Sequence, residues 1–313
     1  MFSFIKKIRK KIRNRKFPPE MKHLRSLHPD FELREEENAW AIYWKKKYIN
    51  HIQPLSVLKN TYHGSCFVFA NGPSLSEIDI EKLSGSHCFG VNGAIVKFRD
   101  SSVRPQFYTI ADPRFLSLHF DLVTEVLESG CHSFFTFNTL SRICEIDASV
   151  LVGKSLFLYD MINQYYQQSM LSNEACIEHF KENPLLAFQE PFDNRIGFSQ
   201  APDVGVFGGR TITFQALQMA YQMGYKHIFL LGLDLSHSGS RFYESSIGSK
   251  KSHSSKLDQD YEPIIKPAFT FASQLIQENK VKIYNLSEHS RLPASIIPKC
   301  SLQEALSMKE SQD

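Results

Sequence analysis

The segment that most constrains the fold of this chain runs from residue 204 to residue 244. It starts with the glycine-rich turn Gly208-Gly209-Arg210-Thr211, continues as an apolar helical pattern, and reaches a buried strand that ends in Gly232-Leu233-Asp234. A helix that leads into a continuously apolar strand is typical of a parallel sheet covered by helices. Ligands of such sheets bind beyond the carboxyl ends of the strands. The sequence therefore predicts a binding site around Gly232 and Asp234.

Short apolar runs alternate with helical patterns through most of the chain. Strands are expected at 66–70, 88–91, 107–111, 133–137, 155–158, 227–232 and 282–284, and helices at 76–83, 116–128, 211–223 and 267–278. This alternation predicts an α/β fold with a single Rossmann-like, mostly parallel sheet. No linker divides the chain into two domains, so residues 61–300 are expected to form one catalytic domain.

Four other regions differ in composition from this domain pattern. Residues 159–200 are polar and aromatic and are expected to form a helical insertion, whereas residues 236–263, rich in Ser, Lys and Asp, are expected to form a lid. Residues 20–60 carry charge runs between apolar islands and are predicted to form a helical collar. Residues 301–313 are expected to be a C-terminal tail.

Residues 1–19 are strongly basic. Eight Lys and Arg residues lie between Lys6 and Lys16, and no acidic residue precedes Glu20. The apolar residues among them fall on one side of a helix, which predicts an amphipathic helix lying on an anionic membrane surface. A solvated, disordered tail is the alternative. Without these eight, 28 basic residues face 33 acidic ones, which gives no general case for nucleic-acid binding.

The cysteines and the apolar runs limit the class of protein further. Six cysteines are widely spaced, with no Cys-x-x-Cys and no Cys/His pairing at zinc spacing. We expect free, buried thiols in a reducing cytoplasm. No run approaches eighteen apolar residues, so a membrane-spanning helix is not expected.

Polar residues follow several of the predicted strands. Asn71-Gly72-Pro73-Ser74 follows the first, Asn92 the second and Asp112 the third. Glycine lets the backbone approach a ligand closely, Ser74 can cap the next helix, and asparagine offers both a donor and an acceptor. The turn matches neither the dinucleotide fingerprint nor the P-loop. Together with Asp234 these residues predict a polar rim around a nucleotide, although ordinary turns and caps would explain any one of them.

The segment around residue 210 and the histidines of the predicted lid are further candidates. Gly209 lies in a turn before a helix, where Thr211 can cap and Arg210 can bind a phosphate or carboxylate, or form a surface ion pair. His237 and His253 are candidate general bases, because the pKa of histidine lies near neutrality. Asp112 and Asp234 are rival bases, and solvated histidines are the simpler interpretation.

These motifs resemble those of known families. Asn71-Gly72-Pro73-Ser74-Leu75, Asn92 and Gly232-Leu233-Asp234 are similar to motifs of bacterial sialyltransferases that use CMP-sialic acid. A fuller resemblance, over roughly residues 65 to 300, is to lipopolysaccharide core biosynthesis proteins of the RfaZ/WaaZ type. It runs through Ala111-Asp112-Pro113-Arg114, Arg210-Thr211-Ile212, Ser240-Arg241-Phe242-Tyr243 and Ile283-Tyr284-Asn285-Leu286-Ser287.

The resemblance implies an activity and a set of roles. It implies a GT-A-like glycosyltransferase that moves Kdo from CMP-Kdo to a Kdo residue on a lipid A–core acceptor, with inversion by direct displacement. Arg210 and Thr211 would bind the leaving phosphate, Arg114 and Arg241 the donor carboxylate, and one of the four candidate bases would take the acceptor proton. The remaining residues of the expected CMP-sugar site are Asn71, Gly72, Ser74, Asn92, Gly209 and Gly232.

Several further expectations and alternatives accompany this hypothesis. No cofactor and no metal are expected to be required, because the chain has no Asp-x-Asp motif of the usual glycosyltransferase kind. The protein is expected on the cytoplasmic face of the bacterial inner membrane, bound peripherally. A transferase for CMP-sialic acid or another ulosonic acid is an alternative, as are a pterin diphosphokinase-like nucleotide enzyme and a membrane-docked interaction protein without enzymatic activity.

Overall fold

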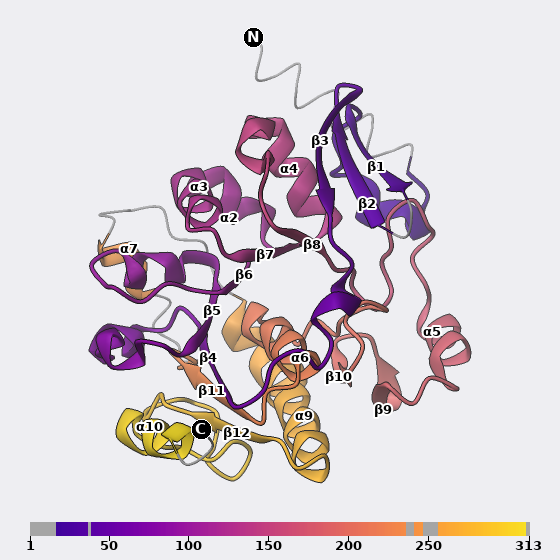
Figure 1. Ribbon diagram of the computed structural model, residues 1–313. Helices are drawn as coiled ribbons and strands as arrows, with labels where there is room; N and C mark the ends of the chain where they lie inside the picture. Colours follow the sequence, from indigo (N-terminus) through magenta and orange to yellow (C-terminus); the bar gives the residue numbers. More distant parts are fainter. Residues whose placement is uncertain (1–16, 37–38, 236–240, 247–255, 311–313) are drawn as a thin grey trace.

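A seven-stranded parallel sheet forms the centre of the protein (Figure 1), in a computed structural model that describes residues 17–36, 39–235, 241–246 and 256–310. Its strands are β4 (Ser65–Phe69), β5 (His87–Val91), β6 (Phe107–Thr109), β7 (His132–Phe135), β8 (Leu156–Leu158), β11 (His227–Leu231) and β12 (Lys282–Asn285). The order is β12-β11-β4-β5-β6-β7-β8, and every pair is parallel. The predicted α/β class and each of the seven predicted strands are confirmed.

The direction in which strands are added reverses once, between β4 and β11. The chain adds β5 to β8 on one side of β4, then returns to place β11 and β12 on the other side. The pairing of Ser65 with His227 and of Phe69 with Leu231 brings the carboxyl ends of β4 and β11 level. A reversal of this kind opens a crevice beyond the strand ends, where ligands of open α/β sheets bind.

Helices cover both faces of this sheet (Figure 1). Cys66 and Val68 of β4 belong to a core shared with α6 (Ile212–Met223) and α9 (Lys266–Glu278). Phe67 and Phe69 belong to a second core, shared with α3 (Phe120–Glu128) and α4 (Phe137–Asp147). Burial on both faces explains why the strands are continuous apolar runs. The helices predicted at 211–223 and 267–278 are confirmed.

Two predicted helices are divided in the structure. The pattern at 116–128 corresponds to α2 (Pro113–Leu118) and α3, which meet at His119. The pattern at 76–83 corresponds to two short 3-10 helices, η3 (Pro73–Glu77) and η4 (Ile80–Leu83). Further 3-10 helices are η5 (Asn92–Phe98) after β5 and η6 (Ala148–Leu151) after α4.

The helical collar predicted for residues 20–60 is wrong. The segment begins with η1 (Pro19–Leu24), continues as the antiparallel sheet β1 (Phe31–Glu36), β2 (Ala39–Trp44) and β3 (Lys47–Ile52), and ends with η2 (Leu55–Leu58). Phe31 and Leu33 are buried between exposed or half-buried polar neighbours, which is the period of a strand. Lys45 and Lys46 both have positive φ, as a tight hairpin turn requires. The described residues of the charge runs, Glu35, Glu36 and Lys45 to Lys47, are exposed.

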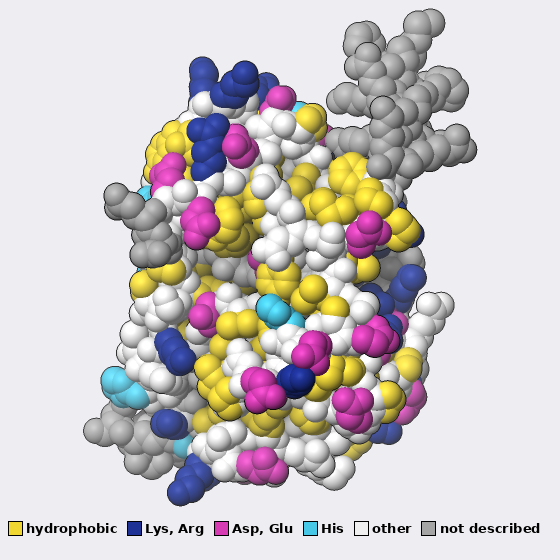
Figure 2. Space-filling view, turned by 90° about the vertical axis from the view of Figure 1, so that its right-hand side faces the viewer, with side chains coloured by type: hydrophobic (Ala, Val, Ile, Leu, Met, Phe, Trp, Pro, Cys, Tyr) yellow, Lys and Arg dark blue, Asp and Glu magenta, His cyan; other side chains and the backbone are white. Residues whose placement is uncertain are grey.

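The insertion also differs from expectation. Residues 159–200 contain α5 (Asn173–Phe180) and a hairpin of β9 (Leu186–Asp193) and β10 (Ile196–Ser199), so the insertion is not mainly helical. Figure 2 shows the face that bears β1–β3 and this insertion, where acidic, basic and apolar side chains are interspersed. Within the predicted C-terminal tail, residues 302–310 form α10 (Leu302–Glu310).

Only parts of the predicted lid and arm can be described. Within residues 236–263 the structure contains α7 (Phe242–Ser246), α8 (Leu257–Asp260) and the start of η7 (Tyr261–Ile265), a π-helical segment that leads into α9. Residues 236–240 and 247–255 of the predicted lid, and residues 1–16, lie outside the described residues. Among the described residues, no helix is both long and apolar enough to span a membrane.

Candidate active site

A cavity of about 270 Å³ lies at the reversal point between β4 and β11. The loops after β4, β5 and β11 and the start of α6 form its walls. Its lining includes eight of the predicted site residues: Asn71, Gly72, Asn92, Arg210, Thr211, Gly232, Asp234 and Arg241. Residues that lie up to 170 positions apart in the sequence are therefore brought together where the sheet topology predicts a ligand.

The close approach of two loops in this cavity requires glycine. The Gly72 N–H donates to the carbonyl oxygen of Gly232 at 2.8 Å, and Gly232 has a φ of +69°. A Cβ atom on Gly72 would lie 2.3 Å from Oδ2 of Asp234 and 2.6 Å from the Gly232 oxygen. No side chain fits between the loops at this point.

Asp234 is held by hydrogen bonds to Ser74. Its Oδ2 accepts from the Ser74 N–H at 2.8 Å, its Oδ1 accepts from the Ser74 hydroxyl, and Ser287 Oγ lies 2.9 Å from Ser74 Oγ. Asp234 is buried, and these contacts join the loops that follow β4, β11 and β12. These contacts position the Asp234 carboxylate, and its remaining lone pairs leave it a candidate general base. Ser74 supports the cavity in this way and does not line it.

The side chains of Asn71 and Asn92 have acceptor capacity to spare. Asn71 Nδ2 donates to the Val91 carbonyl oxygen at 3.1 Å, which fixes the orientation of the amide. The Oδ1 atoms of Asn71 and Asn92 are buried and have no hydrogen-bond partner among the described residues. A buried acceptor without a partner costs about 1–3 kcal/mol. A ligand that donates hydrogen bonds to both oxygens would recover this energy.

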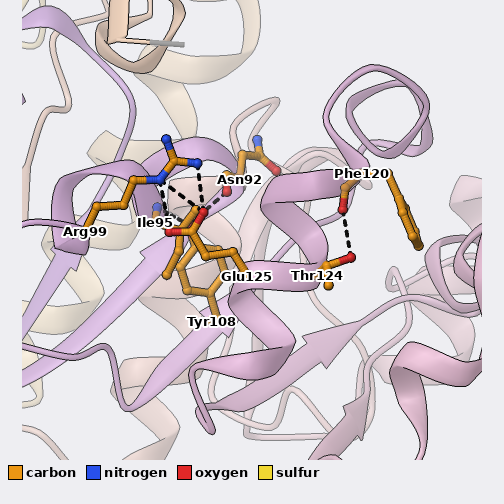
Figure 3. Close-up of polar contacts among 7 residues, drawn as sticks. All are labelled: Asn92, Ile95, Arg99, Tyr108, Phe120, Thr124 and Glu125. Atoms are coloured by element: carbon orange, nitrogen blue, oxygen red, sulfur yellow. Dashed lines mark hydrogen bonds and ion pairs between the residues drawn. The ribbon is translucent and has the colours of Figure 1, made fainter.

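Tyr108 fixes the turn that carries Asn92 (Figure 3). Its hydroxyl donates to the Asn92 carbonyl oxygen at 2.8 Å and accepts from the Ile95 N–H at 2.6 Å. Tyr108 is fully buried, and burial raises the pKa of its hydroxyl well above the usual value. The bidentate pair of Arg99 with Glu125, also in Figure 3, ties the end of η5 to α3.

Our sequence analysis missed Tyr108, although the chain carries a signal for it. Gly90 lies inside β5, and a Cβ atom there would be 2.2 Å from the Tyr108 ring. A glycine within a strand indicates the close approach of another group. Gly90 and Tyr108 pair across β5 and β6, two residues before Asn92.

The start of α6 forms the wall opposite these asparagines. Thr211 caps the helix, its Oγ1 accepting from the Phe214 N–H at 3.2 Å. Gly209 and Arg210 have φ values of +53° and +55°, which turn the chain into the helix. The Gly209 N–H donates to the Arg195 carbonyl oxygen at 3.0 Å, so it is not available to a phosphate. The amino end of this twelve-residue helix suits an anion.

Ion pairs orient the two arginines of this cavity. Arg210 Nε lies 3.7 Å from Asp260 Oδ2, and Arg241 pairs with Glu244 at 2.8 Å. The Phe242 N–H, at the start of α7, donates to the Asn71 carbonyl oxygen at 3.1 Å. Arg210 and Arg241 both line the cavity, and the Phe242 contact holds the segment that carries Arg241 against the loop of Asn71.

Asp112 and Arg114 pair with each other. Asp112 caps α2 by accepting from the Arg114 N–H at 2.9 Å, and the Arg114 guanidinium approaches its Oδ2 at 3.1 Å. The Arg114 side chain is 70% exposed and lines neither of the cavities described here, so the structure does not bring it to the predicted donor carboxylate. The other candidate bases, His237 and His253, lie outside the described residues.

A second, larger cavity adjoins the first. It has a volume of about 520 Å³ and shares Asn92, Arg210, Thr211 and Ile212 with the first cavity. Asp112 lies in its wall, and the insertion contributes five of its other residues. The lining residues that the sequence analysis did not predict include Met161, Asn163, Gln164, Asn194, Arg195 and Gln215.

The sequence of this chain matches a family model. The model describes the 3-deoxy-D-manno-octulosonic acid (Kdo) transferase WaaZ and matches residues 48–303, which include both cavities. The chain belongs to this family. It is therefore a member of a glycosyltransferase family, as the resemblance implied.

Two curated relatives support this membership. A probable 3-deoxy-manno-octulosonic acid transferase of Escherichia coli (strain K12) is 28% identical over 280 residues, which cover 85% of this chain and 93% of the relative. A protein of the same description from Salmonella typhimurium (strain LT2) is 25% identical over 268 residues, covering 82% and 94%.

Two solved structures are more distantly similar. The MAf glycosyltransferase of Magnetospirillum magneticum AMB-1 aligns with 80% of this chain at a TM-score of 0.44 and 12% identity, and the chain spans 38% of that protein's length. The sialyltransferase CstII of Campylobacter jejuni, in complex with a substrate analogue, cytidine-5′-monophosphate, aligns with 78% of this chain and 86% of its own length, at a TM-score of 0.39 and 16% identity.

Proposed function

We propose that this protein transfers Kdo from CMP-Kdo to a Kdo residue of a lipid A–core acceptor, by direct displacement with inversion. Membership of the Kdo transferase family supports Kdo as the transferred sugar. The observation that carries the proposal is the polar cavity at the reversal point, with the buried and unpaired oxygens of Asn71 and Asn92 on one wall and the amino end of α6 on the other.

In our proposal CMP lies in this first cavity. The cytosine amino group and the ribose hydroxyls are donors, and Asn71 and Asn92 offer the acceptors they need. The phosphate lies at the amino end of α6 beside Arg210 and Thr211, where charge develops as CMP leaves. Arg241 is the described arginine that lines this cavity besides Arg210, and we assign the donor carboxylate to it.

The reaction is a single displacement at the anomeric carbon of Kdo. An acceptor hydroxyl oxygen bonds to this carbon while its bond to the phosphate oxygen breaks, and CMP leaves with the electron pair. The hydroxyl proton passes to a general base. Asp112, Asp234, His237 and His253 are the candidates, and both carboxylates already accept hydrogen bonds from a neighbouring residue, Arg114 for Asp112 and Ser74 for Asp234. We propose that no metal or other cofactor is required.

Membrane association belongs to the same proposal. A lipid-linked acceptor is presented at the cytoplasmic face of the inner membrane, and the basic residues between Lys6 and Lys16 would bind its anionic surface. Each basic residue near such a surface contributes about 1 kcal/mol. Removal of residues 1–16 should therefore abolish sedimentation with anionic vesicles and leave transfer to a water-soluble acceptor in place.

The test combines purified protein with CMP-Kdo and a lipid A acceptor that already carries Kdo. We expect release of CMP and an acceptor heavier by one Kdo, with loss of CMP binding in an Asn71→Ala, Asn92→Ala double variant. Comparison of Asp112→Asn, Asp234→Asn, His237→Ala and His253→Ala identifies the base as the variant that loses turnover but still binds CMP. Absence of both CMP binding and transfer would refute the proposal. Preferential use of CMP-sialic acid would indicate that the donor carries a different ulosonic acid. Binding of ATP with magnesium would indicate a diphosphokinase.

A further inference from the structure

The insertion forms one part of the wall of the second cavity. The turn between β9 and β10 contributes Asn194 and Arg195 to its wall, and the segment after β8 contributes Met161, Asn163 and Gln164. A backbone hydrogen bond from Gly209 N–H to the Arg195 carbonyl oxygen, 3.0 Å long, holds the hairpin turn against the start of α6. The insertion therefore completes a cavity that the parallel sheet alone does not form.

The second cavity has two arginines in its wall, and each is paired with a carboxylate, Arg195 with Asp193 and Arg210 with Asp260. The ionisable side chains among the described lining residues are Asp112, Arg195 and Arg210, two cations and one carboxylate. Asp193 holds Arg195, whose Nε donates to Asp193 Oδ1 at 2.7 Å, and this hydrogen bond lowers the pKa of the carboxyl. The Arg195 side chain is 40% exposed, so its guanidinium can bind a second carboxylate.

The other polar residues of the cavity are amides. Asn92, Asn163, Gln164, Asn194 and Gln215 all line it, and Asn163 is buried. Gln215 is oriented by Tyr159, whose hydroxyl donates to its Oε1 at 2.8 Å, so its amino group is presented as a donor. Side-chain amides both donate and accept hydrogen bonds, as recognition of several neighbouring hydroxyl groups requires.

We propose that the second cavity binds the acidic sugar of the acceptor and that Arg195 binds its carboxylate. This inference rests on the proposed function, since it assigns the acceptor of that reaction to a site. An acidic sugar presents one carboxylate and several hydroxyls, which matches the two arginines and five amides of the cavity. The shared wall at Asn92, Arg210 and Thr211 places an acceptor here beside the phosphate of a donor in the first cavity.

The experiment pairs a change in the protein with a change in the acceptor. Transfer is measured with a soluble Kdo-containing acceptor and with the same acceptor carrying a carboxamide in place of its carboxylate. The wild type is compared with Arg195→Gln and Arg195→Lys. Arg34→Gln is the matched control, because Arg34 also pairs with a carboxylate two residues before it but lies in β1, away from both cavities.

We expect Arg195→Gln to raise the KM for the carboxylate acceptor about tenfold, the equivalent of one charge-assisted hydrogen bond. The KM for CMP-Kdo should stay within twofold. On the carboxamide acceptor the wild type and Arg195→Gln should perform alike, and Arg195→Lys should recover part of the loss. Equal thermal unfolding midpoints of the variants and the wild type show that folding is intact.

Two results would overturn the assignment of the acceptor. One is an Arg195→Gln variant whose KM rises as much for the carboxamide acceptor as for the carboxylate acceptor. The other is a rise in the KM for CMP-Kdo with the acceptor KM unchanged, which would give this cavity to the donor. Failure of the proposed function would look different, because the wild type itself would then neither bind CMP nor consume CMP-Kdo.

Discussion

A buried carboxyl group beside the second cavity leads to a prediction about stability. Asp160 follows β8, next to Met161 of the cavity wall, and its Oδ1 is buried without a hydrogen-bond partner among the described residues. Burial raises the pKa of this carboxyl from 3.8 to about 7. The folded protein therefore holds a proton on Asp160 at pH values where the unfolded chain has lost it.

The sign and size of the effect follow from proton linkage. Between about pH 4 and pH 7 the folded state binds more protons than the unfolded state, so ionisation of Asp160 lowers the free energy of unfolding as the pH rises. Well above pH 7 Asp160 is ionised in both the folded and the unfolded state, so its effect on the free energy of unfolding no longer changes with pH. A shift of about three pKa units corresponds to about 4 kcal/mol, of which about 3 kcal/mol is lost between pH 5 and pH 8.

Asp160→Asn should remove this dependence, because an amide carries no charge at any of these pH values. The variant should be more stable than the wild type at pH 8, and the difference should grow by about 3 kcal/mol between pH 5 and pH 8. Urea unfolding of both proteins at closely spaced pH values measures it. Asp100→Asn, at an exposed position, is the control and should change stability by no more than about 0.5 kcal/mol.

A flat difference between Asp160→Asn and the wild type over this pH range would refute the reasoning. So would a variant that is destabilised equally at all pH values, since that would show a hydrogen-bonding role for the carboxylate. A direct titration of the Asp160 carboxyl carbon by nuclear magnetic resonance provides a second measurement, with an expected midpoint near 7.

Three substitutions in the first cavity test how it is built. Gly72→Ala should lower the free energy of unfolding by about 1–3 kcal/mol and weaken CMP binding, because its Cβ would meet Asp234 at 2.3 Å; urea unfolding and calorimetry measure the two effects, and unchanged CMP affinity would contradict the assignment. Tyr108→Phe should lower the free energy of unfolding by about 1–3 kcal/mol and weaken CMP binding, because it leaves the backbone carbonyl oxygen of Asn92 unpaired. The same two assays apply, and no change in either would show that Tyr108 does not support the site. Asp234→Asn should weaken CMP binding about tenfold, through loss of a hydrogen bond to Ser74. A fall in kcat of a hundredfold or more with CMP affinity intact would instead identify Asp234 as the base.

The parallel sheet could be predicted from the sequence because its strands are buried on both faces. Runs such as residues 66–70 and 228–231 are apolar throughout, and each ends at a polar or glycine residue that the structure places at a strand end. The polar residues that follow these apolar runs predicted the first cavity, because the carboxyl ends of parallel strands meet at one edge of the sheet. Eight of the predicted residues indeed line it.

The sheet of residues 31–52 could not be predicted in the same way. Its alternation is short, its strands contain charged residues such as Arg34, and the turn between β2 and β3 uses two lysines with positive φ in place of glycine or asparagine. Charged and flexible side chains obscure a period of two when only one side of a strand is buried. The β9–β10 hairpin was missed for a related reason, since Pro191 interrupts its first strand.

Residues that act by positioning another residue could not be recognised from the sequence either. Ser74 and Arg114 both follow a polar strand end and both were expected to touch the donor. In the structure Ser74 holds Asp234, and Arg114 pairs with Asp112. Spacing predicted that these side chains lie near the site, but only three-dimensional geometry distinguishes a residue that touches a ligand from one that supports its neighbour.

The two cavities are built from different parts of the chain. The first depends on loops of the parallel sheet, whose positions are fixed by strand pairing and by the contacts of Gly72, Ser74 and Asp234. The second depends on the insertion, held to α6 through the hydrogen bond between Gly209 and Arg195. Five residues between 159 and 200 line the second cavity, whereas none of them lines the first. In our proposal this separates the choice of acceptor from the binding of the CMP-sugar, with Arg210 and Thr211 at the boundary where the two substrates react.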